Sequence, residues 1–255
     1  MEVVILGSGT SHGVPMIACD CPVCRSENPR NRRTRCSALL RYGGRSVLID
    51  TSLDFRFQML AHDVRRLDAI LYTHSHADHL HGLDDVRRFN AIQGAAIPVY
   101  ASPTTAREIV RQYRYVFVEE DSGSSKPAVT VHEVTGPFEL FGKDVKPLRV
   151  WHGPWEVTAY RIDDFAYVCD ASRIEERERQ ELKSLECLVI DGLRDRPHPT
   201  HFNIEGALAM VAELGPRRAY LTHITHDLEH EETNRRLPAG VQLAYDGLRI
   251  RLDGS

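Results

Sequence analysis

The sequence predicts a single α/β domain in which two β-sheets pack face to face and helices cover their outer faces. The chain has 255 residues, of which 42% are hydrophobic and 27% charged, an ordinary balance for a globular protein with a substantial core. Its apparent elements run as strands, a helix, more strands, and then alternating helices and strands, an order that suits two layered sheets. No repeat, low-complexity tract or long linker divides the chain, so we interpret residues 1–255 as one domain.

The predicted strands are short apolar runs between turn residues, and residues 42–45 form a predicted hairpin turn. The strands are Val3–Leu6, Ser37–Arg41, Ser46–Ile49, Ala69–Tyr72, Ala128–Val134, Phe138–Phe141, Val145–Val150, Val157–Ile162, Phe165–Cys169, Leu188–Ile190, Arg218–Leu221, Val241–Ala244 and Leu248–Leu252. Helical patterns predict helices at Pro103–Tyr115, Arg173–Leu185 and Asn203–Leu214. The polar segment Glu119–Lys126 is the best candidate for a mobile loop.

Charge and hydropathy exclude some classes of protein. No apolar run reaches the roughly 18 residues of a transmembrane helix. The N-terminus lacks the features of a signal peptide, so we expect a cytoplasmic location and no membrane partner. The formal net charge of −4 argues against nucleic acid as the main partner. Arginines 30, 32, 33 and 35 leave a local basic patch open, but we interpret this run as a solvated surface.

Three of the six cysteines, Cys19, Cys21 and Cys24, lie close together. In a chain without a secretory signal, such a cluster indicates a metal site rather than disulfides. A free thiol cluster without metal is the alternative. The other cysteines fall within apolar runs and are predicted to be core residues; they are Cys36, Cys169 and Cys187.

A short apolar strand is followed directly by a concentration of metal-ligand residue types, His74, His76, Asp78 and His79. Imidazole and carboxylate groups suit Zn²⁺, Mn²⁺ or Fe²⁺. Two residues that are two positions apart on a turn at a strand end, such as His74 and His76, can bind one metal ion. The next pair, Asp78 and His79, can then face a second metal ion. Two such metals can bridge a hydroxide and hold both the attacked and the leaving oxygen. A surface loop rich in histidine is the alternative, and the density of ligand types favours the metal site.

This His-x-His-x-Asp-His motif resembles the signature of the metallo-β-lactamase superfamily. The resemblance implies an αββα sandwich with further ligands on later strand-end loops, where His152, Asp170 and His223 occupy matching positions. It also implies a division of roles: His74, His76 and His152 would bind one metal, Asp78, His79 and His223 would bind the other, and Asp170 would bridge them. Asp50 matches the acidic residue of the family's first motif and would fix the tautomer of a ligand histidine.

The cysteine loop at residues 19–24 needs a fourth ligand to form a closed structural zinc site, and His226 is the candidate. A Cys-x-Cys-x-x-Cys loop after Gly-x-Gly-Thr-x-x-Gly-Val-Pro, with His-x-x-His near the end, resembles the PhnP family of cyclic phosphodiesterases over nearly the whole chain. His12 departs from the amide residue of that family, which leaves the substrate contacts open. PqqB-type proteins have a similar cysteine loop.

The resemblance implies hydrolysis of a small phosphodiester with two divalent metals, Zn²⁺ or Mn²⁺, beside the structural zinc. Asp78 would accept a proton from the nucleophile, and His201 matches a family histidine that would donate one to the leaving alkoxide. Imidazole suits this role because its ordinary pKa of about 6.5 lies near the working pH. A helix-entry role before Asn203 is the alternative for His201. The glycine-rich turn at residues 7–13 is interpreted as a wall of the cleft.

Other functions remain open on the sequence. A tRNase Z-like endonuclease would share the fold and ligands, but the chain has no long basic insertion to hold tRNA. A non-catalytic PqqB-like binding protein is a second alternative, although such a protein would not need a full ligand set. A thioesterase or lactonase is a third, because the metal centre does not choose between phosphorus and carbonyl carbon. The sequence also allows a homodimer, and it assigns no role to His12, His81 or His198.

Overall fold

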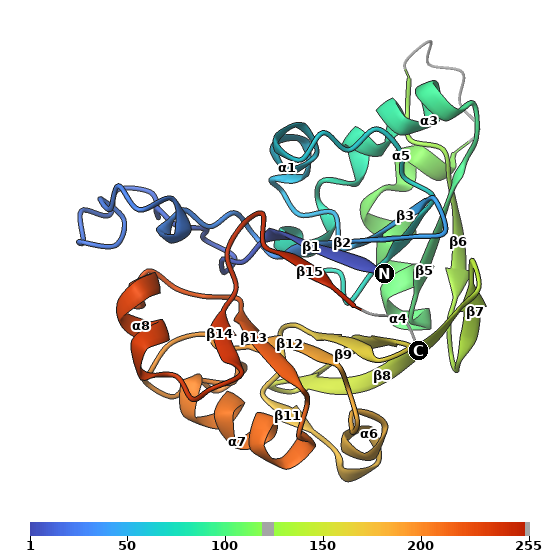
Figure 1. Cartoon of the computed structure of the whole chain (residues 1–255). Coiled ribbons are helices and arrows are strands. Elements are labelled where there is room, and N and C mark those ends of the chain that lie inside the picture. Colours follow the sequence, from blue (N-terminus) through green and yellow to red (C-terminus); the bar gives the residue numbers. More distant parts are fainter. Residues whose placement is uncertain (119–124, 253–255) are drawn as a thin grey trace.

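The computed structural model describes residues 1–118 and 125–252, so most of the predicted mobile segment Glu119–Lys126 lies outside the described residues. Within these ranges the strands form two sheets (Figure 1). The first sheet has seven strands in the order β15-β1-β2-β3-β4-β5-β6. The second has eight, in the order β11-β8-β9-β10-β12-β13-β14, with β7 paired to β8.

The elements have the following bounds. The first sheet comprises β1 (Glu2–Gly7), β2 (Ser37–Tyr42), β3 (Arg45–Ile49), β4 (Ala69–Leu71), β5 (Ile97–Ala101), β6 (Val129–Glu133) and β15 (Arg249–Arg251). The second comprises β7 (Phe138–Leu140), β8 (Lys143–His152), β9 (Trp155–Ile162), β10 (Phe165–Val168), β11 (Arg173–Ile174), β12 (Cys187–Asp191), β13 (Arg218–Thr222) and β14 (Val241–Leu243). The helices are η1 (Pro29–Asn31), α1 (Phe55–Ala61), α2 (Ala77–Leu80), η2 (Leu83–Val86), α3 (Arg87–Gln93), α4 (Pro103–Gln112), α5 (Arg114–Phe117), α6 (Glu176–Glu181), α7 (Ile204–Leu214) and α8 (His230–Arg236).

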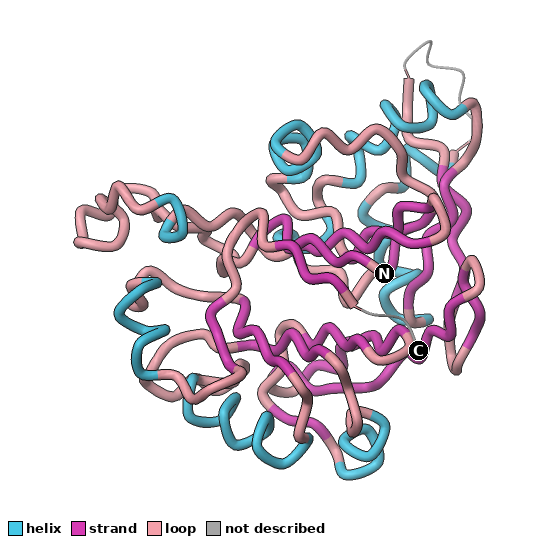
Figure 2. Tube along the Cα trace, viewed as in Figure 1, coloured by secondary structure: helices cyan, strands magenta, loops and turns pink. Residues whose placement is uncertain are grey.

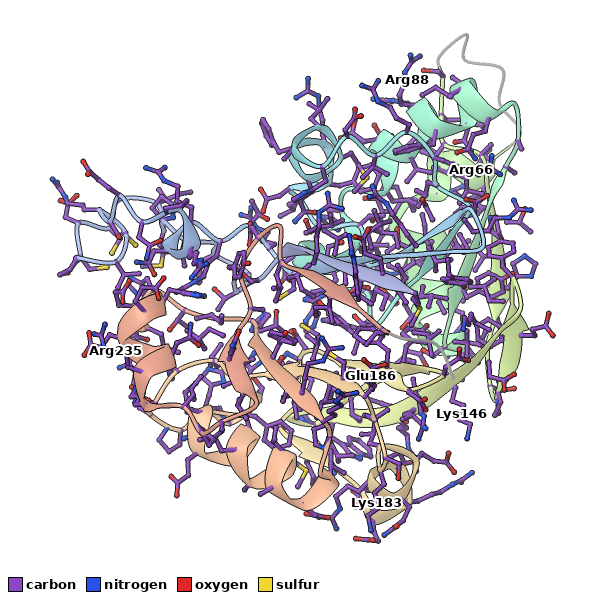
Figure 3. The ribbon with its side chains drawn as sticks, viewed as in Figure 1. Arg66, Arg88, Lys146, Lys183, Glu186 and Arg235 are labelled. Atoms are coloured by element: carbon purple, nitrogen blue, oxygen red, sulfur yellow. The ribbon has the colours of Figure 1, made fainter. Side chains whose placement is uncertain are left out.

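The sheets pack against each other and helices cover both outer faces (Figure 2). Buried apolar side chains form three layers: one between the sheets, one under α1, α3 and α4, and one under α6 and α7. Charged residues such as Arg66, Arg88, Lys183 and Arg235 are exposed on the outside (Figure 3). The predicted αββα sandwich is therefore confirmed. Across the described ranges, no helix combines the length and the apolar character that crossing a membrane requires.

Parallel pairing brings the carboxyl ends of many strands to one edge of the sandwich. Strands β3, β4 and β5 are parallel in the first sheet, and β10, β12 and β13 are parallel in the second. Ligands bind in α/β proteins beyond such carboxyl ends. Polar residues stand at or just after these ends, namely Asp50, Thr73, Asp170, Asp191 and His223. The connectivity thus gathers residues far apart in the sequence.

Two hydrogen bonds fasten the sheets together beside the histidine motif. The hydroxyl of Tyr160, a wholly buried residue of β9, donates to the carbonyl of Tyr72, which follows β4, at 2.9 Å. The backbone N–H of Thr158 on β9 donates to the carbonyl of Thr73, also at 2.9 Å. The start of the histidine motif is therefore held from both sheets.

Two predicted helices differ from the structure. The helix predicted at Arg173–Leu185 begins instead as strand β11, because Ile174 pairs with Val150 and packs into the core, and only Glu176–Glu181 is helical. The helix predicted at Pro103–Tyr115 breaks at Tyr113, whose φ of −108° and ψ of 35° separate α4 from α5. Strand β5 and the short helices α1, α3 and α8 were not predicted.

The prediction of a solvated arginine run is wrong for Arg33. This residue is only 1% exposed, and its guanidinium donates to the backbone carbonyls of Thr225 and Leu228, each at 2.8 Å. A buried guanidinium is tolerated where acceptors satisfy its N–H groups. The positive charge therefore ties the N-terminal segment to the loop after β13.

We expect the substitution Tyr160→Phe to lower the free energy of unfolding by about 1–3 kcal/mol, because it leaves the buried Tyr72 carbonyl without this donor. Urea denaturation followed by circular dichroism measures the change. The control Tyr245→Phe removes a hydroxyl that has no hydrogen-bond partner among the described residues, on a side chain that is only half-buried, and should change stability by less than about 0.5 kcal/mol. Equal effects of the two substitutions would contradict the cross-sheet role.

Candidate metal centre

The histidine motif folds into a tight loop followed by a single helical turn. After β4, the chain is extended at His76 and then enters α2, where the N–H groups of His79 and Leu80 both donate to the His76 carbonyl at 3.0 Å. From outside, the amide of Gln112 on α4 donates to the carbonyl of Ser75 at 3.2 Å. These bonds fix the backbone from which the ligand side chains project.

Asp170 lies at the centre of the candidate site. It follows β10, is 2% exposed, and presents its two carboxylate oxygens to different sets of imidazoles. Oδ2 lies 3.5 Å from Nε2 of His74 and 3.9 Å from Nε2 of His152. Oδ1 lies 3.5 Å from Nε2 of His79 and 3.1 Å from Nε2 of His223. One carboxylate therefore separates two ligand sets.

The other two predicted ligands join these sets. A ligand atom of His76 lies within 4.8 Å of those of His74 and Asp170, and its ring is 5.4 Å from that of His152. Asp78 groups in the same way with His79, Asp170 and His223. The structure thus brings together every side chain predicted for the two-metal centre, here called the Asp170 cluster: His74, His76, Asp78, His79, His152, Asp170 and His223.

The unpaired atoms of the Asp170 cluster fit divalent cations. Nε2 of His74, Nε2 of His79 and both ring nitrogens of His223 are buried without a hydrogen-bond partner. Buried polar atoms are normally paired, because leaving them unpaired costs free energy. Imidazole and carboxylate donors that converge in this way are the ligands of Zn²⁺ and Mn²⁺. The residues present therefore fit the metals that the sequence implied.

The electrostatics of the Asp170 cluster also favour positive charge. Burial raises the pKa of Asp170, but the neighbouring His223 and His79 together hold it well below its usual range. Burial lowers the pKa of His223, while Asp170 and other neighbours raise it to about 10. For His74, burial and then the charge of His79 lower the pKa. The carboxylate of Asp170 thus stays ionised inside the protein and attracts positive charge.

Asp50 supports the cluster from beneath. It accepts hydrogen bonds from the N–H and the hydroxyl of Thr73, at 2.8 and 2.7 Å, and its Oδ2 lies 2.7 Å from Nδ1 of His79. A carboxylate on Nδ1 leaves Nε2 of the imidazole directed at the cluster. The structure therefore places Asp50 where the family resemblance implied a residue that fixes a ligand tautomer.

Three strand-end residues of the site adopt left-handed backbone conformations. The φ angles are 62° at Asp50, 58° at Asp170 and 57° at His223. Such conformations are uncommon for residues other than glycine, and they cluster at functional sites where the surrounding structure maintains the strain. Here the left-handed conformation turns the chain sharply at each strand end.

His201 lies beside the Asp170 cluster, as predicted, and Asp191 orients it. The His201 ring stacks on that of His223 with a centroid distance of 4.5 Å and an angle of 16°. Asp191, which is wholly buried at the end of β12, lies 2.9 Å from Nδ1 of His201. It also accepts the N–H groups of Asp170 and Ala171, at 2.8 and 2.9 Å. Nδ1 of His201 is thereby committed to Asp191, which leaves Nε2 available for chemistry.

Sequence reasoning missed Asp191. The available signal was an acidic residue closing an apolar strand, the same signal that pointed to Asp50 and Asp170. It also missed Gln112, which a sequence pattern does not distinguish from other polar residues of a helix.

Three histidines had no role assigned from the sequence. His81 lies 2.9 Å from the Gln112 amide oxygen, His198 accepts the N–H of Thr200 at 3.3 Å, and His12 is exposed.

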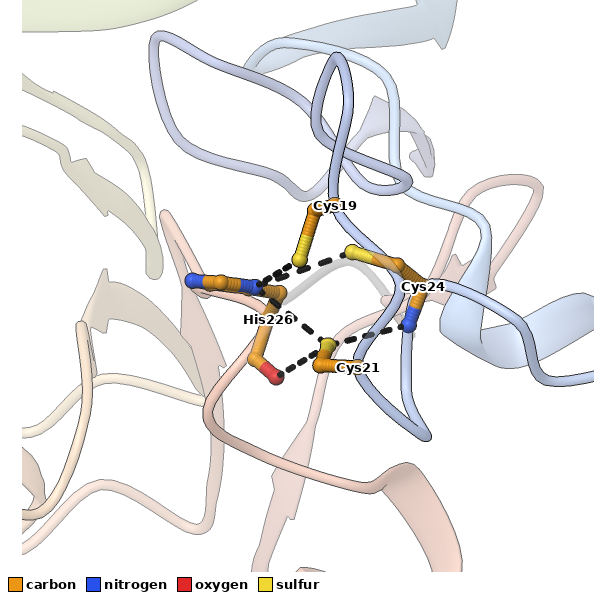
Figure 4. Close-up of side chains that lie close together, drawn as sticks. All are labelled: Cys19, Cys21, Cys24 and His226. Atoms are coloured by element: carbon orange, nitrogen blue, oxygen red, sulfur yellow. Dashed lines mark hydrogen bonds between the residues drawn. The ribbon is translucent and has the colours of Figure 1, made fainter.

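The cysteine loop closes on His226 (Figure 4). Nδ1 of His226 lies 3.2 Å from Sγ of Cys19, 3.4 Å from Sγ of Cys21 and 3.6 Å from Sγ of Cys24. Burial raises the pKa of Cys21, but hydrogen bonds from the Cys24 N–H and from neighbouring side chains lower it to about 7. Three sulfur atoms around one imidazole nitrogen fit the tetrahedral ligand set of a structural zinc.

The segment between β1 and β2, which carries the cysteine loop, projects from the sandwich (Figure 1) but is anchored to the loop after β13. Arg33 binds carbonyls on both sides of His226. The glycine-rich turn packs on the same loop, where the Ser8 carbonyl accepts the N–H of Ile224 at 2.9 Å. A Cβ on Gly7 would lie 2.0 Å from the Arg35 carbonyl, so close backbone contact explains that glycine.

Comparison with known proteins agrees with this fold. The Beta-lactamase superfamily domain matches residues 45–224. The crystal structure of a new diphosphatase from the PhnP family is 44% identical, with a TM-score of 0.92, and the match covers 99% of this chain and 98% of the other. Zn²⁺-bound PqqB from Methylobacterium extorquens, at 21% identity, and human tRNase Z, short form, at 18%, share the fold, with TM-scores of 0.80 and 0.74 and coverage of 99% of this chain and 100% of the other in both cases.

Among curated proteins, the chain is 38% identical to an octanoyltransferase of Porphyromonas gingivalis over 99% of its own length. The chain spans only about half (52%) of the length of that octanoyltransferase. The coenzyme PQQ synthesis protein B of Methylobacterium nodulans is 27% identical over 99% of this chain and 100% of its own length.

The αββα sandwich, with its ligand-rich strand edge, and the domain match together show that the chain belongs to the metallo-β-lactamase superfamily. Within that superfamily, the chain belongs to the PhnP family.

We expect Asp191→Asn to weaken metal binding about 10- to 100-fold, because the asparagine amide cannot accept all three hydrogen bonds and the Asp170 loop loses its anchor. The free energy of unfolding should also fall, by about 2 kcal/mol. Competition with a chromophoric chelator measures the affinity. The control Asp195→Asn, on an exposed partner of Arg236, should match the wild type. Wild-type affinity in Asp191→Asn would show that Asp191 does not support the cluster.

Proposed function

We propose that this protein hydrolyses small phosphodiesters with two divalent metal ions, Zn²⁺ or Mn²⁺, at the Asp170 cluster. The observation that carries the proposal is the division of ligands by Asp170, since a single metal would need only one of the two sets. His74, His76 and His152 would hold one ion, Asp78, His79 and His223 the other, and Asp170 both. When bound, such a pair activates water and neutralises phosphate oxygens. We further propose that residues 1–255 act as one domain.

The protein's own residues would supply the proton transfers. Asp78, whose Oδ2 lies 3.4 Å from Nε2 of His79, would accept a proton from the nucleophile at its carboxylate. His201, held through Nδ1 by Asp191, would deliver a proton from Nε2 to the leaving alkoxide. An alkoxide is a poor leaving group unless it is protonated, so this second transfer matters most for esters of ordinary alcohols.

Hydrolysis of a diphosphate is the second candidate, because the PhnP-family relative at 44% identity is described as a diphosphatase. The two reactions make different demands on His201. A departing phosphate is a much weaker base than an alkoxide and needs little protonation. The pair of His201 and Asp191 therefore favours a phosphodiester with an alcohol leaving group.

A small substrate is favoured over RNA by the net charge of −4, which weakens attraction to a phosphate backbone. Ribonuclease Z of Mycolicibacterium gilvum is 27% identical over only 59% of this chain and 51% of its own length. A non-catalytic role like that of a PqqB-type protein, and hydrolysis of a thioester or lactone, are the remaining alternatives. The same substrate series separates all of them.

We expect the purified, metal-loaded protein to hydrolyse ribose 1,2-cyclic phosphate and bis(p-nitrophenyl) phosphate faster than a dinucleoside diphosphate, a precursor tRNA or a thioester. Chromatographic product analysis gives kcat/KM for each substrate. Preference for the tRNA would identify an endonuclease, and preference for the diphosphate would select the second candidate. Failure on every substrate would favour a binding protein.

The variant His201→Asn should sharpen this result. Its kcat on ribose 1,2-cyclic phosphate should fall about 100-fold or more, since the alkoxide loses its proton donor. The fall on bis(p-nitrophenyl) phosphate should be much smaller, because p-nitrophenolate leaves without a proton. Equal losses on the two substrates would reject the role of His201 as the general acid.

We also expect one equivalent of zinc at the cysteine loop, separate from the Asp170 cluster. Cys24→Ser should remove this equivalent and lower the unfolding temperature by several degrees, because metal binding at such a site contributes to folding free energy. Elemental analysis and calorimetry measure both effects. The control Cys187→Ala, in the core, should keep the zinc. Full zinc content in Cys24→Ser would exclude the site.

A further inference from the structure

A large aromatic side chain stands exposed beside the Asp170 cluster. Trp155 is the first residue of β9 and is 56% exposed. Its ring centroid lies 5.7 Å from that of His76, at an angle of 85°, and 5.9 Å from that of His152, at 39°. Single exposed apolar residues are common on protein surfaces. Trp155 differs from such residues because it lies against two candidate metal ligands, which suggests a role in binding.

The backbone beneath Trp155 is firmly held. Trp155 pairs with His152 across the end of the β8–β9 hairpin. The turn between them contains Gly153, at φ 60°, where a Cβ would lie 2.7 Å from Cγ2 of Thr200. The Thr200 carbonyl in turn lies 2.8 Å from Nδ1 of His152. The hairpin end that carries Trp155 is therefore packed against Thr200, in the segment that leads to His201.

We propose that Trp155 is a stacking platform for the nucleobase of a nucleoside-containing phosphodiester, an inference that rests on the proposed function. A nucleotide separates its base from its phosphate by one sugar. A base stacked on Trp155 thus leaves the phosphate next to His76 and His152 and within reach of the Asp170 cluster. Stacking on an indole suits any base, because every base presents a π-face.

Because Trp155 is an isolated apolar side chain, its surface suits a ligand with one planar ring better than a partner with a broad apolar surface. Its sequence neighbours Pro154 and Glu156 are exposed, and Glu156 is charged. The other large exposed apolar side chains of the described ranges lie on other segments, such as Phe57 and Leu60 on α1. One aromatic face among polar groups matches a single planar ring joined to a polar sugar phosphate.

Binding of unreactive products tests the platform without depending on turnover. The metal-loaded protein is titrated with AMP and with ribose 5-phosphate, which share a phosphate and a sugar but differ in the base. Calorimetry should give an affinity for AMP about 10-fold or more higher than for ribose 5-phosphate. The substitution W155L should reduce the ratio of the two affinities to about one, while W155F should retain part of it. Equal affinities in the wild type, or an unchanged ratio in W155L, would overturn the proposal.

Fluorescence provides a second readout. The chain has two tryptophans, so W151F leaves Trp155 as the sole indole. Trp151 contacts Arg173, whose guanidinium carbon lies 4.9 Å from its ring centroid. The W151F protein should keep the wild-type affinity ratio, and its fluorescence should be quenched by AMP but not by ribose 5-phosphate. If both ligands quench equally, Trp155 reports only the phosphate and the platform is rejected.

The outcomes separate three cases. If Trp155 only steadies His76 and His152, W155L will weaken both ligands equally and leave their ratio unchanged, which rejects the platform. If phosphodiesters are hydrolysed but the base adds no affinity, the proposed function stands and the platform fails. If AMP is preferred through Trp155 but no phosphodiester is hydrolysed, the platform stands and the proposed function fails.

Discussion

The buried carboxylate of Asp170 is the constraint on which the site depends. A carboxylate in the interior is costly unless positive charge and hydrogen bonds compensate for its lost hydration. In this protein one oxygen faces His74 and His152, and the other faces His79 and His223. His74 and His79 follow the parallel strand β4, and His223 follows the parallel strand β13, whereas His152 ends the antiparallel strand β8. The same arrangement that satisfies one anion divides the ligands into two sets.

The positions of the candidate ligands are maintained by residues around the Asp170 cluster. Asp50 fixes His79, Asp191 anchors the backbone of Asp170, and the sheets themselves are joined by Tyr160 and Thr158 next to the histidine motif. The cysteine loop extends this support, because His226 lies three residues beyond His223 and Arg33 binds carbonyls on either side of it. Any displacement of the cysteine loop would therefore reach the Asp170 cluster through one short segment. This connection gives a physical reason why a candidate structural metal site would lie so close to the candidate active site.

Sequence reasoning succeeded where the signal was local. The histidine motif is dense, and His152, Asp170 and His223 each end or follow an apolar run, so the fold and the candidate ligands could be predicted from the residues and a family resemblance. It failed where the partner is distant. Arg33 looked solvated because the carbonyls that bury it are 192 and 195 residues away. Ile174 looked helical because its partner, Val150, belongs to another strand. Asp191 went unnoticed because a strand-end aspartate commonly caps a turn, and its partner His201 is identified only by the folded chain.

The fold does not choose the reaction. Relatives described as an octanoyltransferase and a PQQ synthesis protein each match 99% of this sequence, and one described as a ribonuclease Z matches 59% of it. Activity depends on the site rather than on the sandwich. Metal ligands alone would activate water against phosphorus or carbonyl carbon alike. Discrimination must come from residues that touch neither metal nor water. Two such residues lie beside the Asp170 cluster. In the proposed function His201 would protonate the leaving oxygen, and Trp155 would offer an apolar face to a planar ring of the substrate. On these two proposals, a substrate that has an alcohol leaving group and a planar ring would engage both residues, so groups beyond the phosphate would decide which phosphodiester is preferred.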